Sequence, residues 1–205
     1  MNMAVYKNGK KSGKEGEVIH SSWHGRAYTR RMPVSVANPQ TEAQQAHRRA
    51  FAEISRLSAD MKNAHSIGLH WKAVREKLNT HSVFRTLNKD CYGADGVDYA
   101  RVRISFGTVS GVSITSAAVD AQGVVSVVFS SRHSAAEAND EVYLFVYCPE
   151  EREGRLAHPV GRGAGSICAE LPLEWRGHVV HLYAFVKSTR SRTSETIYIG
   201  PFGEE

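Results

Sequence analysis

Long hydrophobic runs are missing from this chain of 205 residues. No stretch of about 18 apolar residues occurs, which argues against a membrane-spanning helix. The N-terminus, MNMAVYKNGKKSGKEGE, lacks the apolar core of a secretory signal, so we expect a cytoplasmic protein. Hydrophobic residues still make up 41% of the chain, enough for a packed core rather than wholesale disorder.

Cysteine is scarce. Cys91, Cys148 and Cys168 are an odd number at wide spacing, which excludes a disulfide scaffold. The pattern is typical of a reducing compartment, with at most one incidental disulfide between Cys148 and Cys168.

Motifs for catalysis are also missing. The chain has no G-x-S-x-G nucleophile elbow. GKKSGK has three residues between its glycines instead of the four of a phosphate loop, and Glu15 follows the last lysine. GRGAG precedes an expected strand, whereas a dinucleotide fingerprint opens a helix. We therefore expect no enzymatic activity, no cofactor and no small-molecule substrate.

The ten histidines do not indicate a metal site. His178 and His181 lie three apart on an expected strand, so their side chains point to opposite faces. His20 and His24 can share a face, but no third ligand stands at a suitable spacing nearby.

Charge is unevenly distributed. Residues 1–90 carry 16 Lys and Arg against 7 Asp and Glu, whereas residues 91–205 carry 10 against 14. The basic half indicates either attraction to phosphate or an acidic partner, or simply a solvated polar surface. The second interpretation is favoured, because Arg49, Glu53 and Arg56 stand at spacings that allow local pairing on a helix.

Helical patterns dominate the first half, after a loose basic arm at residues 1–22 and a short hairpin at 23–31 around Gly25. Thr41 stands three residues before Gln44, a capping-box pattern, and apolar residues then recur at helical spacing over 42–62. A second helix is expected within 65–79, with a buried stripe of Ile67, Trp71, Val74 and Leu78. Ser82 caps a third, ending near residue 90, and the polar turn CYGADG marks a boundary.

After residue 98 the hydrophobic period changes to two. Strands are predicted at 101–105, 112–119, 124–130, 142–148, 166–171, 178–187 and 196–200. Short strands separated by regular turns predict an antiparallel β-sandwich. The expected fold is thus α+β: a basic, helical N-terminal region over residues 1–97 and a sandwich over 98–205.

The two longest strands, 142–148 and 178–187, are apolar on both faces. A sandwich strand needs only one buried face, so the second must meet something else. The alternatives are the N-terminal helices, another subunit or a ligand. The aromatic residues of this candidate interaction face are Tyr143, Phe145, Tyr147, Tyr183 and Phe185.

Several spaced motifs carry a resemblance to a known family. SGKEGEVIHSSWHGRAYTRRMP, NPQTEAQQAHRRAF, DYARVRISFGTV, LFVYCPEE and HVVHLYAFVKSTRSRTSETIYIG together resemble an uncharacterised bacterial family, domain of unknown function 6266. The resemblance covers nearly the whole chain. It implies a strand-and-helix region joined to a sandwich similar to fibronectin type III or immunoglobulin domains, and it implies no activity. NPQTEAQQ also looks like segments of phage structural proteins, an analogy only.

Two functions follow from these patterns. The first is a non-enzymatic structural or assembly module that acts by protein binding or self-association through the aromatic face, and the phage analogy suggests its origin in a mobile element. The alternative is a protein that binds nucleic-acid backbones, because cations are interleaved with Trp23 and Tyr28. The competing interpretation is that these two rings fill a small N-terminal core. The candidate cations are Lys10, Lys11, Lys14, Arg26, Arg30, Arg31, Arg48 and Arg49.

Overall fold

The N-terminal strands of the computed structural model form an antiparallel meander in the order β1-β2-β3-β4. They are β1 (Val5–Lys7), β2 (Lys10–Glu15), β3 (Val18–Trp23) and β4 (Arg26–Arg31). The structure describes residues 4–7, 9–35, 40–93, 95–131 and 137–203, and the chain divides into two compact units, residues 1–44 and 45–205. The predicted hairpin around Gly25 is found as β3–β4, but its first strand begins at Val18, inside the segment expected to be a loose arm, and that segment also contributes β1 and β2.

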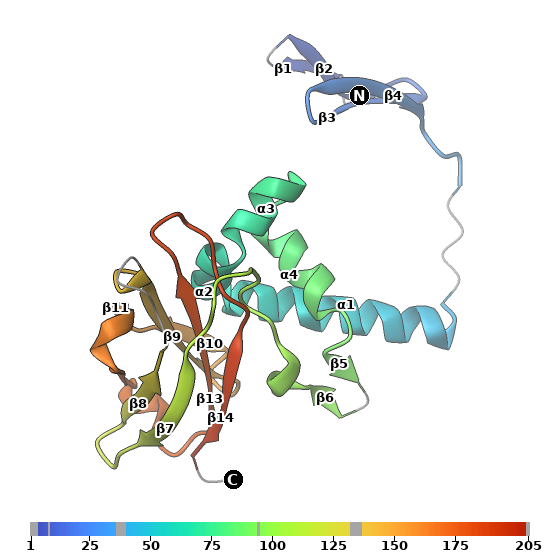
Figure 1. The fold of residues 1–205 in the computed structure, drawn as a ribbon. Coiled ribbons are helices and arrows are strands. Elements are labelled where there is room, and N and C mark those ends of the chain that lie inside the picture. Colours follow the sequence, from blue (N-terminus) through green and yellow to red (C-terminus); the bar gives the residue numbers. More distant parts are fainter. Residues whose placement is uncertain (1–3, 8, 36–39, 94, 132–136, 204–205) are drawn as a thin grey trace. The chain divides into compact units, whose positions relative to one another are not determined.

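Helices α1 to α4 follow (Figure 1). They are α1 (Glu42–Asp60), α2 (Lys62–Gly68), α3 (His70–Glu76) and α4 (Thr80–Asn88). The helix predicted at 42–62 is confirmed as α1, and the amide of Gln44 donates to the hydroxyl of Thr41 over 3.3 Å. The cap of α4 is Asn79 and not Ser82, because the Asn79 side chain accepts the amide of Ser82 at 2.7 Å.

The single helix predicted within 65–79 is instead two helices that break after Gly68. The carbonyl of Gly68 accepts the amide of Phe106 at 3.2 Å and the hydroxyl of Thr193 at 3.0 Å. A Cβ at position 68 would lie 2.7 Å from Ser105 Cβ, so glycine is what lets the loop pass against the helix.

The break also changes which residues α3 buries. Leu69 and Ala73 are buried, whereas Val74 is 64% exposed and Leu78 is 39% exposed, so the predicted stripe is wrong at these two positions. A continuous helix would have kept one stripe, but two shorter helices present different faces.

The remaining strands form antiparallel sheets. One sheet has the order β10-β9-β13-β14 with β11 also paired to β9, another has the order β12-β8-β7, and β5 pairs with β6. All predicted strands except the first are found, and β10 and β11 are additional. The bounds are β5 (Tyr92–Gly93), β6 (Gly96–Val97), β7 (Ser113–Val119), β8 (Val124–Ser130), β9 (Glu141–Cys148), β10 (Glu153–Leu156), β11 (Val160–Gly161), β12 (Ser166–Glu170), β13 (Val180–Lys187) and β14 (Ile197–Phe202).

The strand predicted at 101–105 is wrong. The chain forms a short 3₁₀ helix, η1 (Tyr99–Arg101), and then runs on without strand pairing. Side chains satisfy its backbone instead: Asn88 accepts the amide of Arg103 at 2.7 Å, and the hydroxyl of Thr196 accepts the amide of Ser105 at 2.8 Å.

Hydrophobic clusters lie on both sides of the β9–β13 pair. Val142, Leu144 and Val146 belong to a cluster with the core residues of β8 and β12. The alternate residues of β9 belong to a second cluster with α1, α2 and α4. The helices, the larger sheet and the smaller sheet therefore form three layers of an α+β fold within residues 45–203 (Figure 1).

The division into units differs from the expected domains. The unit boundary falls between Gln44 and Gln45, whereas the boundary expected after residue 97 falls inside the second unit. The reason is that the helices share one hydrophobic cluster with the sheet, so they do not form a region of their own.

Candidate functional site

The β2–β3–β4 sheet carries cations and aromatic rings on one face. Strand pairing places Lys14 beside Ile19, Ile19 beside Arg30, Ser21 beside Tyr28, and Trp23 beside Arg26. Paired residues share a face, and so do alternate residues along a strand. We call the resulting surface the basic face, defined by Lys14, Ile19, Ser21, Trp23, Arg26, Tyr28 and Arg30. It contains no carboxylate.

The basic face is exposed. Trp23 is 64% exposed and Tyr28 is 47% exposed, so the interpretation that these rings fill a small N-terminal core is wrong. No described residue of the first 35 is buried. Within the described part of the chain, no ion pair engages Lys14, Arg26 or Arg30.

The other candidate cations either have a local hydrogen-bond or ion-pair partner or lie on α1. Lys11 forms an ion pair with Glu15, and Arg31 forms one with Glu17 at 3.2 Å. The ammonium of Lys10 donates to the backbone carbonyl of the β3–β4 turn. The two remaining cations occupy exposed positions of α1 in the second unit, namely Arg48 and Arg49. The structure therefore brings three of the eight candidates together on the basic face, and Lys10, which alternates with Lys14 along β2, lies on the same side with its ammonium bound to the turn.

The aromatic sheet face is covered by the chain itself. Its residues are at most 6% exposed: Tyr143, Phe145, Tyr147, Tyr183 and Phe185. The rings of Tyr143 and Phe185 stack with centroids 5.0 Å apart. The hydroxyl of Tyr183 donates to the carbonyl of Tyr99 over 2.8 Å, and burial raises the pKa of Tyr183. Of the three alternatives, cover by the helices is the one observed, so this face presents no surface to a partner in this structure.

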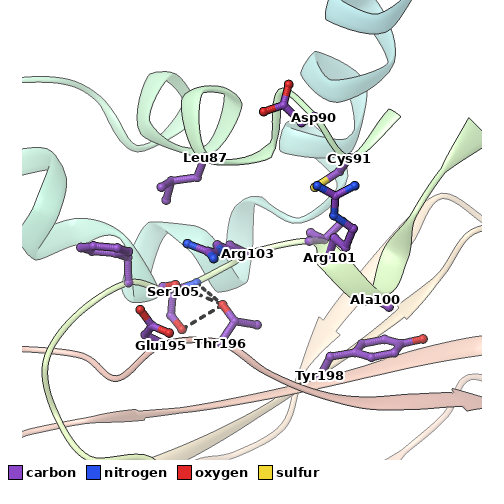
Figure 2. Close-up of a pocket in the computed structure, with 12 residues that line it drawn as sticks. Leu87, Asp90, Cys91, Ala100, Arg101, Arg103, Ser105, Glu195, Thr196 and Tyr198 are labelled. Atoms are coloured by element: carbon purple, nitrogen blue, oxygen red, sulfur yellow. Dashed lines mark hydrogen bonds between the residues drawn. The ribbon is translucent and has the colours of Figure 1, made fainter. Parts of the chain in front are cut away.

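A cleft of about 450 Å³ lies where the end of α4 meets η1, the loop after it and β14 (Figure 2). Its lining combines charged and apolar side chains. The residues that the figure labels are Leu87, Asp90, Cys91, Ala100, Arg101, Arg103, Ser105, Glu195, Thr196 and Tyr198, and Val102 and Phe106 complete the lining.

Two buried or half-buried side chains hold this lining in place. The side-chain amide of Asn88 donates to the carbonyl of Arg103 at 2.9 Å and accepts its amide at 2.7 Å. The hydroxyl of Thr196 accepts the amides of Ile104 and Ser105 at 2.9 and 2.8 Å. The backbone of the arginine-bearing segment is therefore fixed on both sides of the cleft.

The cysteines are free, and two of them are buried. Cys148 Sγ lies 3.8 Å from Nδ1 of His178, whose Nε2 lies 3.3 Å from a carboxylate oxygen of Glu150. This order matches that of a thiol nucleophile and its base. However, burial raises the pKa of Cys148, and the side chain is 0% exposed, so the thiol stays protonated and inaccessible. Burial likewise raises the pKa of Cys91 at the cleft.

A second polar cluster lies among the helices. Ser58 Oγ is 2.9 Å from Nδ1 of His81, and Nε2 of His65 is 2.7 Å from the carbonyl of Ser58. Desolvation lowers the pKa of His65 to about 4, so the ring is neutral at pH 7 and donates from Nε2. Its ring also packs on Phe84, with centroids 5.0 Å apart, which makes this cluster part of the core.

The described residues lack two kinds of feature. They contain no group of three or more His, Cys, Asp or Glu side chains placed to hold a metal ion. They also contain no helix with the length and hydropathy needed to cross a membrane.

The sequence pattern indicates the basic face but not the cleft. The alternation Arg26, Tyr28, Arg30 puts cations and a ring on one side of a strand, so the basic face was readable once β4 was assigned. The cleft is lined by Leu87, Arg103 and Thr196, which are far apart in the sequence, so no local sequence pattern predicts that they lie together.

Comparison with known proteins agrees with the resemblance noted from the motifs. Residues 10–200 match the model of a family described as "Family of unknown function (DUF6266)". The chain therefore belongs to this family. No curated protein matches the sequence.

Proposed function

We propose that this protein binds the backbone of single-stranded nucleic acid through the basic face and that this role is non-enzymatic. The observation that carries the proposal is one exposed sheet face with three cations, two aromatic rings and no carboxylate. Cations that track phosphates, combined with rings that stack on bases, are the usual means of binding single strands without sequence preference.

The spacing on β4 suits an extended ligand. Arg26 and Arg30 are four residues apart on one strand, or about 13 Å, and Tyr28 lies between them. Trp23 lies beside Arg26 on the neighbouring strand. A single strand crossing this face would meet a cation, a ring and a cation in turn. Its phosphates would neutralise charges that have no acidic partner on the same face.

The small sheet also has a physical reason to bind a ligand. None of its described residues is buried, so strand hydrogen bonds and cross-strand pairs hold it without a core of its own. A ligand that covers the basic face would remove Trp23 and Tyr28 from water and stabilise the sheet by mass action.

Salt dependence tests the proposal. Anisotropy of a labelled mixed-sequence 20-nucleotide DNA strand would be measured against the whole protein between 50 and 200 mM NaCl. Three phosphate contacts predict a slope of log K against log salt of about −2, or roughly 20-fold weaker binding across that range. The double variant Arg26→Gln/Arg30→Gln should reduce the slope to about −0.7. Trp23→Ala should weaken binding by about 1–3 kcal/mol.

Arg31→Gln is the matched control, because Arg31 lies on β4 but on the other face and is paired with Glu17. It should leave the slope close to that of the wild type. Undetectable binding at 20 mM NaCl, or an equal loss in the control and in the double variant, would refute the proposal.

An assembly role is the second candidate. The aromatic face cannot supply its contact surface, but β1 is an edge strand on which Val5 is 61% and Tyr6 is 70% exposed. A second chain pairing along this edge would cover both side chains. Light scattering across a concentration series tests this role, and a strict monomer at all concentrations would remove it.

The finer fold type is also a proposal. The antiparallel order of the five-stranded and three-stranded sheets and the hydrophobic cluster between these two sheets support a fibronectin type III or immunoglobulin-like sandwich. An experimental structure compared strand by strand with such domains would decide this, and a different strand connectivity would contradict it.

A further inference from the structure

The cleft at the end of α4 contains four charged side chains that balance one another. Arg101 and Arg103 supply two positive charges, and Asp90 and Glu195 supply two negative ones. In Figure 2 Arg103 lies between Leu87 and Thr196 and Glu195 lies beside Thr196, whereas Asp90 and Arg101 lie beside Cys91 at the other end of the cleft. Within the described part of the chain, no ion pair joins any of the four.

We propose that this cleft binds a small zwitterion of the free amino-acid class with an apolar side chain. The guanidinium groups of Arg101 and Arg103 present paired donors that match a carboxylate. A carboxylate stands at each end of the cleft, and Glu195, on the side of Arg103, can accept hydrogen bonds from an ammonium group. A simple anion would leave the two carboxylates opposed to it, and a simple cation would oppose the arginines, whereas a zwitterion satisfies both sets.

The apolar part of the ligand also has a place. Leu87, Phe106 and Tyr198 line the cleft beside the charged groups. A volume of about 450 Å³ lies in the range of small-molecule sites, and the lining of this cleft is more polar than apolar, which suits a charged ligand. This size admits an amino acid and is too small for a polymer or a large cofactor.

The backbone that carries the arginines is organised before any ligand arrives. Asn88 fixes both backbone groups of Arg103, and Thr196 fixes the two residues that follow. Asn88 is 0% exposed, so its amide has no freedom to turn away. A fixed backbone reduces the ordering cost of binding and leaves only the guanidinium ends to settle on the ligand. The proposal is independent of nucleic-acid binding and differs from the expectation that no small molecule binds.

The test uses three compounds with the same ring and different charged groups. Amide chemical shifts of the whole ¹⁵N-labelled protein would be followed with L-phenylalanine, with 3-phenylpropionate, which lacks the ammonium, and with phenylalaninamide, which lacks the carboxylate. Phenylalanine should saturate with a Kd of about 1 mM, as small ligands of this size do, and should shift the amides of residues 101–106. Each comparator should bind about tenfold more weakly.

Variants separate the two charged sets. Arg103→Gln should weaken phenylalanine about tenfold and abolish the binding of 3-phenylpropionate. Glu195→Gln should weaken phenylalanine but bind 3-phenylpropionate at least as tightly as the wild type does, because one of the carboxylates that oppose this anion is gone. Arg190→Gln removes an equal charge from a loop residue outside the cleft lining and should change nothing. All replaced side chains are exposed, and thermal unfolding of each variant checks that it folds.

Three results would overturn the proposal. The first is an absence of saturable shifts with phenylalanine up to about 20 mM in the folded protein. The second is equal affinity for all three compounds, which would mean that only the ring is recognised. The third is a loss in Arg190→Gln as large as the loss in Arg103→Gln, which would mean that only net charge matters.

Discussion

Gly154 on β10 is the position where one added methyl group tests the layered core most directly. A Cβ at this position would lie 2.7 Å from Cε2 of Phe145 and closer still to Cζ. Favourable carbon–carbon contacts need about 3.5–4.0 Å, so the ring would have to move by about 1.5 Å. Phe145 is 0% exposed within the cluster that joins the helices to the sheet, so it has no free space to move into.

Gly154→Ala should therefore lower the free energy of unfolding by about 3 kcal/mol, at the upper end of the range for overpacking. The φ angle of Gly154 is not in the left-handed region, so the expected cost is steric and not conformational. Gly163→Ala is the control, since a Cβ there meets nothing within 4 Å, and it should change stability by less than about 1 kcal/mol.

A second substitution shows whether the ring is the cause. Phe145→Leu removes the clashing ring atoms and should cost about 1.5 kcal/mol by itself. The double variant Gly154→Ala/Phe145→Leu should lose about 2 kcal/mol less unfolding free energy than the sum of the two single losses, because the added methyl group no longer meets the ring. Urea unfolding followed by circular dichroism gives all four values. A loss below 0.5 kcal/mol in Gly154→Ala, or additive losses in the double variant, would refute the packing argument.

Three further predictions concern buried groups. Arg162→Met should cost about 3–5 kcal/mol in urea unfolding, because it leaves Asp140, 4% exposed and 3.5 Å from the guanidinium, without its cation; Arg190→Met should be nearly neutral. The pKa of His65, about 4 in the folded chain against 6.5 ordinarily, means that the unfolded state binds more protons between these values. The contribution of His65 to stability should thus be full above about pH 6.5 and about 2 kcal/mol smaller by pH 5. Desolvation also lowers the pKa of His181 to about 4, so His65→Gln should reduce the fall in that range without abolishing it. Ellman's reagent should react quickly with Cys168 alone at pH 7.5 and with all three thiols after unfolding, since the other two cysteines are buried; a second fast thiol would contradict this.

Local patterns were sufficient where an element depends on its own residues. The capping pair Thr41 and Gln44 and the helical period that follows predicted α1, because both act within a few residues. The apolar character of both faces of β9 and β13 predicted that a second layer must cover them, since buried area dominates the stability of a strand.

Tertiary contacts decided the rest. Residues 102–105 alternate like a strand, yet side chains and not a neighbouring strand form their backbone hydrogen bonds. Asn88 on α4 accepts the amide of Arg103, and Thr196, far away in the sequence, accepts the amide of Ser105. Gly68 breaks a periodic helix because the chain near Ser105 passes too close for a side chain. The cleft exists only where these segments meet.

By itself, the sequence determined the α+β class, the family, the first helix and the need for a covering layer, because each depends on short-range periodicity or on spaced motifs. Only the tertiary structure decided that the helices form that layer, that a four-stranded sheet stands as a separate unit, and that four balanced charges gather around one cleft. These outcomes depend on which distant segments approach one another, and the free energy of such contacts cannot be predicted from any short stretch of the sequence.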